Sequence, residues 1–294
     1  MADGASGSTV PRRQLGRYLR ELRNKARLTV KAAAEALEWS EAKIWRIETG
    51  QTSLRSHDVE TMCRVYGAGS DLAGALMALA KETKAKGWWH SYGDVIPNWL
   101  DVYISLEEAA TALSIYQSEL VPGLLQTEDY ARTLIGTDNP GVNDQEIERR
   151  VQLRIERQAL LTRVTDPPGI GVVLNEAVIR RPIGNEQIMA DQLAHLLDVG
   201  ELPNLAVRVM PFVRGMHYGV MSGPFVMLEF PINGTGMPTE PTTIYIEGFA
   251  GALYLDKPHE VDRYEHAFNN IKGASLNEAA SRKFIADAVK EWRR

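Results

Sequence analysis

Apolar residues at helical spacing mark the first part of the chain as a set of short helices. Leu15, Leu19 and Leu22 recur at i, i+4 and i+7, so they share one face of a helix whose open side carries arginines. Similar apolar sets follow at residues 33–37, 44–47, 59–66 and 72–79. The pattern predicts a compact all-α domain of five helices at residues 11–87, after a disordered tail at residues 1–10.

Residues 29–50 have the pattern of a helix-turn-helix within this domain. Thr29 and Ser40 are suitable N-caps for two short helices, and only a few residues separate those helices. Alanines on the first helix allow the two backbones to approach closely, which is the packing that presents the second helix to a DNA major groove. The residues expected to face outward are Glu41, Ala42, Lys43, Trp45 and Arg46. An ordinary pair of amphipathic helices would give the same pattern.

The pattern changes after residue 87. A capping box, S-x-x-E, at residues 105–108 predicts a helix that continues through Ala112, Leu113 and Tyr116. Strand patterns follow at residues 170–174, 205–210, 225–230 and 244–247, with helices at 187–197 and after Pro258 and Ser275. We therefore expect a larger α+β regulatory domain at residues 88–294, α-helical over 88–165 and mixed over 166–294, with about four or five strands.

Charge separates the same two parts. Residues 1–87 hold 15 Lys and Arg against 10 Asp and Glu, whereas residues 88–294 hold 18 against 28. A basic patch on a small helical domain is typical of proteins that bind the DNA phosphate backbone, although a solvated charged face is the simpler explanation. The single cysteine, Cys63, excludes a disulfide framework. The start of the chain does not have the pattern of a signal peptide and no apolar run has the length of a membrane helix, so we expect a cytoplasmic protein.

Residues 19–29 and 40–50 resemble the Cro/C1-type bacterial repressors, whose core reads approximately LR-x-x-R-x-x-x-x-LT and then S-x-x-x-I-x-R-I-E-x-G. The resemblance implies base contacts by Glu41, Ala42 and Arg46. It also implies backbone contacts by Thr29, Lys31, Ser40 and Lys43, and a structural salt bridge between Arg23 and Glu48. Two positions depart from the pattern: Val30 replaces a phosphate-binding Gln, and Glu38 replaces a Gly where a left-handed residue is wanted.

The remaining segments are similar to the C-terminal domain of bacterial antitoxin-like transcriptional regulators. The resemblance rests on SELVPGLLQTEDYA at residues 118–131, VLNEAVIRRP at 173–182 and LPNLAVRVMPF at 202–212. It implies a regulatory module that interacts with a small partner protein encoded nearby. The sequence does not identify that partner.

Few side chains of the second domain suggest chemistry. Trp88, Trp89 and Trp99, together with His217, are a candidate ligand or partner site, although an aromatic plug at the domain junction is the favoured explanation for the tryptophans. His259, Asp262 and His266 have metal-like spacing, but they fall opposite the apolar face formed by Val261, Tyr264, Phe268 and Ile271. No G-x-S-x-G or P-loop motif accompanies them. We therefore expect no catalytic residue, metal or cofactor.

These observations favour a sequence-specific regulator of transcription. It would be a homodimer that binds double-stranded DNA at an inverted-repeat operator, controlled through its C-terminal domain by a partner protein or a ligand. The alternative is a metabolite-binding protein or enzyme with an accessory DNA-binding head. Catalytic side chains that converge in one pocket would distinguish the second class from the first.

Overall fold

The computed structural model describes the chain except for residues 1–9, 84–87, 93, 97, 233–235 and 250. Its internal contacts divide it into two compact units, Met1–Ser91 with Pro97–Ala109, and Tyr92–Ile96 with Ala110–Arg294. The disordered tail predicted for residues 1–10 lies outside the described residues up to residue 9. Val10 already belongs to the first helix.

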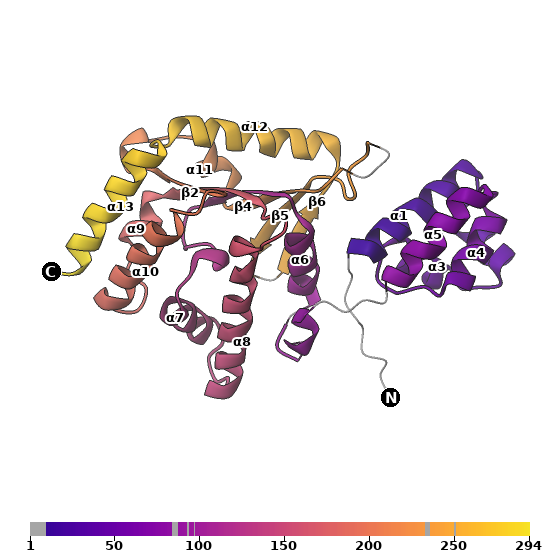
Figure 1. Ribbon diagram of the computed structural model, residues 1–294, viewed down its shortest axis with the longest axis horizontal. Coiled ribbons are helices and arrows are strands. Elements are labelled where there is room, and N and C mark those ends of the chain that lie inside the picture. Colours follow the sequence, from indigo (N-terminus) through magenta and orange to yellow (C-terminus); the bar gives the residue numbers. More distant parts are fainter. Residues whose placement is uncertain (1–9, 84–87, 93, 97, 233–235, 250) are drawn as a thin grey trace. The chain divides into compact units, whose positions relative to one another are not determined.

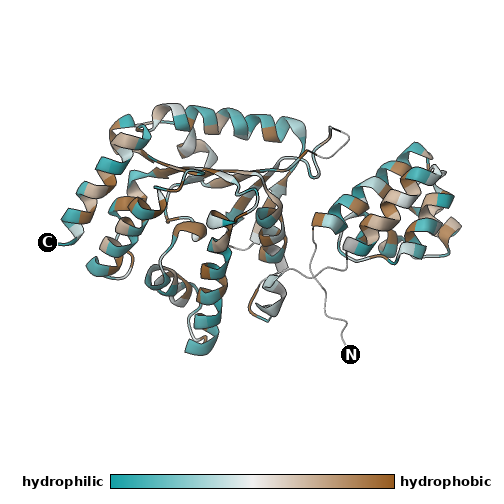
Figure 2. Cartoon of the chain, in the orientation of Figure 1, coloured by the Kyte–Doolittle hydropathy of each residue, from teal (hydrophilic) through white to brown (hydrophobic). Residues whose placement is uncertain are grey.

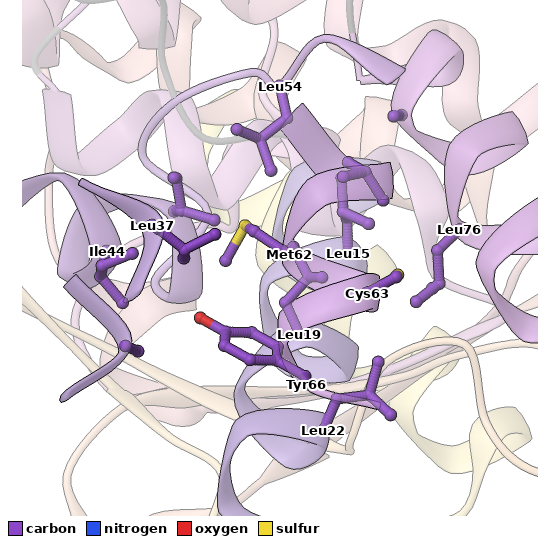
Figure 3. Packing of buried hydrophobic residues seen from close by; sticks show 14 of the residues in the cluster. Leu15, Leu19, Leu22, Leu37, Ile44, Leu54, Met62, Cys63, Tyr66 and Leu76 are labelled. Carbon is purple, nitrogen blue, oxygen red and sulfur yellow. The ribbon is translucent and has the colours of Figure 1, made fainter. Parts of the chain in front are cut away.

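The first unit is helical. It begins with α1 (Val10–Lys25), α2 (Val30–Leu37), α3 (Glu41–Glu48), α4 (Ser56–Val65) and α5 (Ser70–Glu82). Leu15, Leu19 and Leu22 are all buried, which confirms the predicted apolar face of α1. They pack with residues of α2, α3, α4 and α5 in one core, which Figure 3 shows around Met62 and Cys63. Burial raises the pKa of the Cys63 thiol, as expected for a core cysteine.

A short 3-10 helix, η1 (Trp88–Tyr92), precedes α6 (Asn98–Ala109), and α6 groups with the first unit. The predicted capping box is wrong, because Ser105 lies inside α6 and not at a helix start. Ser105 is buried, and its Oγ accepts a hydrogen bond from the backbone N–H of Val10 at 3.0 Å. The serine thus satisfies a donor at the start of α1, where the first turn lacks intrahelical partners.

The second unit contains one mixed sheet. Its strands are β1 (Ala112–Gln117), β2 (Gly169–Asn175), β3 (Leu205–Met210), β4 (Phe225–Glu229), β5 (Thr243–Gly248) and β6 (Gly251–Leu255). The strand order is β3-β2-β1-β4-β5-β6. β1 is parallel to β2 and β2 to β3, whereas β4, β5 and β6 continue the sheet in antiparallel fashion.

The prediction of a helix through Ala112, Leu113 and Tyr116 is therefore wrong. These residues form β1, which pairs with both β2 and β4 at the centre of the sheet. Tyr116 lies three residues after Leu113 and four after Ala112, a spacing that also fits a helix, and a strand of six residues is too short for periodicity alone to decide between the two. The region 88–165 is consequently not all helical, and β6 adds a strand without a predicted pattern.

Helices cover the sheet on both faces. The unit contains α7 (Glu128–Asp138), α8 (Asp144–Arg157), α9 (Glu176–Arg180), α10 (Glu186–Val199), α11 (Tyr218–Ser222), α12 (Pro258–Ala274) and α13 (Glu278–Trp292), with short 3-10 turns η2 (Gly123–Leu125), η3 (Gln158–Thr162) and η4 (Phe212–Arg214). Figure 1 shows α12 along one face of the sheet, and α7 and α8 on the other side.

The apolar face predicted for α12 is confirmed. Phe268 and Ile271 are buried against Tyr116 and Phe225 of the sheet, and Val261 and Tyr264 of α12 pack on the same cluster. Figure 2 shows hydrophilic residues along α8 and on the outer side of α12. Among the described residues, no helix combines the length and hydrophobicity needed to span a bilayer.

Candidate nucleic-acid interface

The position of α3 is fixed by direct contact between backbones. A Cβ built on Gly16 of α1 would lie 2.5 Å from the carbonyl oxygen of Ile47 and 2.9 Å from that of Glu48. Gly50, which follows α3, has φ +72° and would bring a Cβ within 2.8 Å of Arg13. Only glycine fits at either position, so α1 and the end of α3 are closer than any side chain would allow.

Side-chain caps define the turn between α2 and α3. Thr29 Oγ1 accepts a hydrogen bond from Ala32 N–H at 3.1 Å, and Ser40 Oγ accepts one from Lys43 N–H at 3.2 Å. Glu38 has φ 56° and ψ 38°, which places it in the left-handed region where a glycine was expected from the family pattern. The helix-turn-helix therefore keeps its left-handed turn residue without glycine.

A buried ion pair joins α1 to the end of α3. Arg23 Nε lies 2.6 Å from Glu48 Oε1, and Arg23 Nη2 lies 2.8 Å from Glu48 Oε2. The remaining Nη1 donates to the carbonyl oxygen of Leu28 at 2.8 Å, just before α2. The hydrogen bonding with Glu48 raises the pKa of Arg23. The Arg23 guanidinium thus connects α1, the end of α3 and the segment before α2, and it keeps both charges paired in the core.

The outer face of α3 carries the residues predicted to read bases. Glu41, Ala42, Trp45 and Arg46 are all exposed, and their spacing places them on one side of the helix. Arg46 Nε donates to the carbonyl oxygen of Ala42 at 3.3 Å. Trp45 is 54% exposed, so its indole presents a large apolar surface to solvent beside Arg46. The sequence predicts the outward position of Trp45 but not a role for it.

The predicted phosphate contacts differ in their surroundings. Thr29, Lys31 and Ser40 are exposed, and among the described residues the two cap hydroxyls act only as hydrogen-bond acceptors, so each can still donate a hydrogen bond. Lys43 is half-buried because its Nζ lies 3.3 Å from the centroid of the Trp39 ring. This cation–π contact could not be predicted from spacing alone, since Trp39 lies in the turn.

The candidate aromatic site divides between the two units. Trp88 and Trp89 stack edge to face at 6.0 Å, and the buried Trp89 donates from Nε1 to Asp101 at 2.7 Å within the first unit. His217 belongs to the second unit, and so does Tyr92, the last residue of η1, whose hydroxyl donates to Glu156 at 2.6 Å. Burial raises the pKa of Tyr92 to about 12. The side chain of Trp99 lies outside the described residues.

His217 has a local structural role. Its Nδ1 accepts a hydrogen bond from the backbone N–H of Gly219 at 3.1 Å and thereby caps α11. Burial lowers the pKa of His217, which favours the neutral ring that such a cap requires. Two surface hollows of about 520 and 310 Å³ lie beside α10 and α13, and His217 does not line either one.

The histidines of α12 are not arranged as a metal site. His259, Asp262 and His266 are exposed, opposite the apolar face of the helix, as their spacing predicted. His266 Nε2 instead lies 3.1 Å from Asn270 Nδ2. In the part of the chain that the structure describes, no group of three His, Cys, Asp or Glu side chains is placed to hold a metal ion.

Comparison with known proteins divides the chain in a similar way. Residues 100–287 match the family described as a domain of unknown function, DUF5753, and residues 14–76 match a helix-turn-helix domain. No curated protein and no solved structure matches the chain. The second match covers α2 and α3, with the caps, ion pair and exposed face described above.

Proposed function

This chain belongs to the family defined by the domain of unknown function DUF5753, with a helix-turn-helix domain at its N-terminal end, and we propose that it is a sequence-specific transcriptional regulator of the Cro/C1 type. Double-stranded DNA is the ligand of the helix-turn-helix. The observation that carries the proposal is the exposed face of α3, which is held on a close-packed frame and contributes no side chain to the core.

Each residue of this face has a chemistry suited to base edges. Arg46 can donate two hydrogen bonds to a guanine, Glu41 can accept from the amino group of a cytosine, and Ala42 can contact a thymine methyl group. Trp45 lies between them and adds a broad apolar surface for a further methyl group or a sugar. We expect the sequence preference to depend on these four side chains.

A second set of residues would position α3 on the backbone. Thr29, Lys31, Ser40 and Lys43 flank the reading face, and each can donate to a phosphate oxygen. The stacking of Lys43 on Trp39 limits the directions that its ammonium group can take, which would lower the entropy lost on phosphate binding. These contacts would favour all DNA sequences equally.

The second unit would control this activity. We propose that two copies bind an inverted repeat, and that a small partner protein or ligand on the second unit changes the separation of the two α3 helices from one DNA turn, roughly 34 Å. A catalytic role is the less supported alternative, since His217 uses Nδ1 to cap α11.

Selection from a random DNA library by the full chain would test the proposal. We expect one inverted-repeat sequence to be enriched, and fluorescence anisotropy should show tighter binding to it than to a scrambled sequence of equal length. The affinity should fall steeply as salt increases, because phosphate contacts release counterions. Equal affinity for the enriched and the scrambled DNA would contradict sequence-specific recognition.

A further inference from the structure

An unusual number of apolar side chains is exposed in one short segment of the second unit. Residues 212–221 contain η4 and all but the last residue of α11, and six of these ten residues are exposed large apolar residues. They are Phe212, Val213, Met216, Tyr218, Val220 and Met221. Val213 is 90% exposed and Met221 is 75% exposed. We call this segment the apolar loop.

The apolar loop is held in place at several points. The backbone N–H of Phe212 donates to Glu176 Oε2 at 2.8 Å, and Tyr218 stacks edge to face on His266 at 5.4 Å. Gly219 lies so close to the sheet that an added Cβ would be 2.3 Å from the Tyr116 ring. The backbone therefore has anchors on β1 and α9, and the Tyr218 ring adds one on α12, while all six apolar side chains remain exposed.

The apolar loop also differs from its surroundings in charge. Arg214 is its only residue that is charged at neutral pH, whereas residues 88–294 hold 28 Asp and Glu against 18 Lys and Arg. Two acidic domains repel each other unless they meet through a surface that carries little charge. The apolar loop is such a surface.

The exposed apolar area of the loop is close to the apolar area of one side of a homodimer interface. With roughly 200 Å² for a full aromatic side chain and about 100 Å² for Val or Met, the six side chains expose on the order of 500 Å² of apolar surface. A standard interface buries about 800 Å² per partner, and about 65% of a homodimer interface is apolar. The apolar part of one such half-interface is therefore also about 500 Å².

We infer that the apolar loop is the contact between two copies of this chain. In a two-fold contact the same loop is present on both sides, so apolar side chains meet apolar side chains and no new complementary surface is needed. The inference rests on the proposed function, because it identifies the surface that would place two helix-turn-helix units on one inverted repeat.

Sedimentation equilibrium of the full chain tests this assignment. We expect the wild type to have twice the chain mass of 32.7 kDa. The double variant Val213→Asp with Met221→Glu should have the mass of one chain, because it places unpaired charges in the contact. Phe249→Asp is the matched control, since Phe249 is likewise a highly exposed apolar residue of the second unit but lies outside the apolar loop.

A labelling experiment covers the case in which the charged variants do not fold. Cys63 is the only cysteine of the chain and is buried, so Met221→Cys introduces one reactive thiol. Its modification by iodoacetamide should slow at least about fivefold as the protein concentration rises through the association range, whereas Phe249→Cys should react at a constant rate. Equal behaviour of the two thiols would overturn the assignment.

The measured masses can also contradict the inference directly. A wild type that is monomeric at all concentrations, or a double variant that remains dimeric, would overturn the inference. Mass is measured without DNA, so the proposed function is tested separately by anisotropy. The wild type could be a dimer and the double variant a monomer, while the wild type binds the enriched and the scrambled DNA equally. That result would refute the proposed function and leave the interface assignment intact. If the proposed function and the interface assignment are both correct, the monomeric variant should need at least about tenfold more protein than the wild type to half-saturate the enriched DNA.

Discussion

Replacement of Glu38 by glycine should stabilise the helix-turn-helix. Glu38 has φ 56° and ψ 38° at the end of α2, a left-handed conformation in which a side chain crowds the following carbonyl group. Its own side chain is exposed, so the substitution removes no part of the core.

The magnitude follows from two opposing terms. Relief of the left-handed conformation is worth roughly 1–2 kcal/mol, and the greater freedom of glycine in the unfolded chain takes back about 0.5–1 kcal/mol. We therefore expect a net gain of about 0.5–1 kcal/mol. For a domain of 60–100 residues this corresponds to a rise of roughly 2–8 °C in the thermal midpoint.

Calorimetry of the full chain should resolve this change in the transition that unfolds the helical unit. The control is Glu38→Ala, which removes the same carboxylate but keeps a Cβ in the left-handed region. Operator affinity should not fall in either variant. A midpoint for Glu38→Gly at or below that of Glu38→Ala would show that the backbone of residue 38 is not strained, and the reasoning would fail.

Four further substitutions test the DNA-binding face of α3, the buried ion pair of the helical unit and the histidine cap of α11. Arg46→Ala should weaken binding to the enriched operator by about 1–3 kcal/mol and relax the preference at one base pair, whereas Lys43→Ala should weaken all sequences similarly; equal losses on specific and random DNA for Arg46→Ala would remove it from base reading. Glu48→Ala leaves the Arg23 guanidinium buried without its carboxylate, so urea unfolding of the helical unit should show a loss of about 3–5 kcal/mol, and a loss below about 1 kcal/mol would mean that the pair is not structural. Because the folded-state pKa of His217 is lowered, its contribution to stability is present above its unfolded value of about 6.5 and is lost as the pH falls through the folded value. His217→Asn keeps a cap acceptor without this titration and should flatten the stability profile below pH 6.5; an unchanged profile would contradict the role of the neutral ring.

The sequence predicted best what depends on local chemistry. The leucines of α1 have one consistent helical spacing, Thr29 and Ser40 were expected to cap α2 and α3, and the resemblance to the Cro/C1-type repressors implied a left-handed residue at Glu38. Both features involve residues only a few positions apart. Local patterns of this kind determine helix faces and turns before any tertiary contact forms.

The missed features depend on contacts between distant segments. Tyr116 belongs to a strand because β2 and β4 lie on either side of it, which its own neighbours in sequence cannot indicate. The position of Lys43 over Trp39 and the exposure of residues 212–221 likewise become visible only once the fold is known. A list of apolar residues does not show which of them the backbone keeps in water.

The close approach of Gly16 to the carbonyl groups of Ile47 and Glu48 makes the orientation of α3 independent of its outer side chains. The frame is made by backbone atoms and by buried residues, which do not belong to the exposed face of α3. Glu41, Ala42, Trp45 and Arg46 can therefore be randomised together in a combinatorial library without loss of the fold. This separation makes the domain suitable for retargeting, because new operator preferences can be selected on an unchanged scaffold.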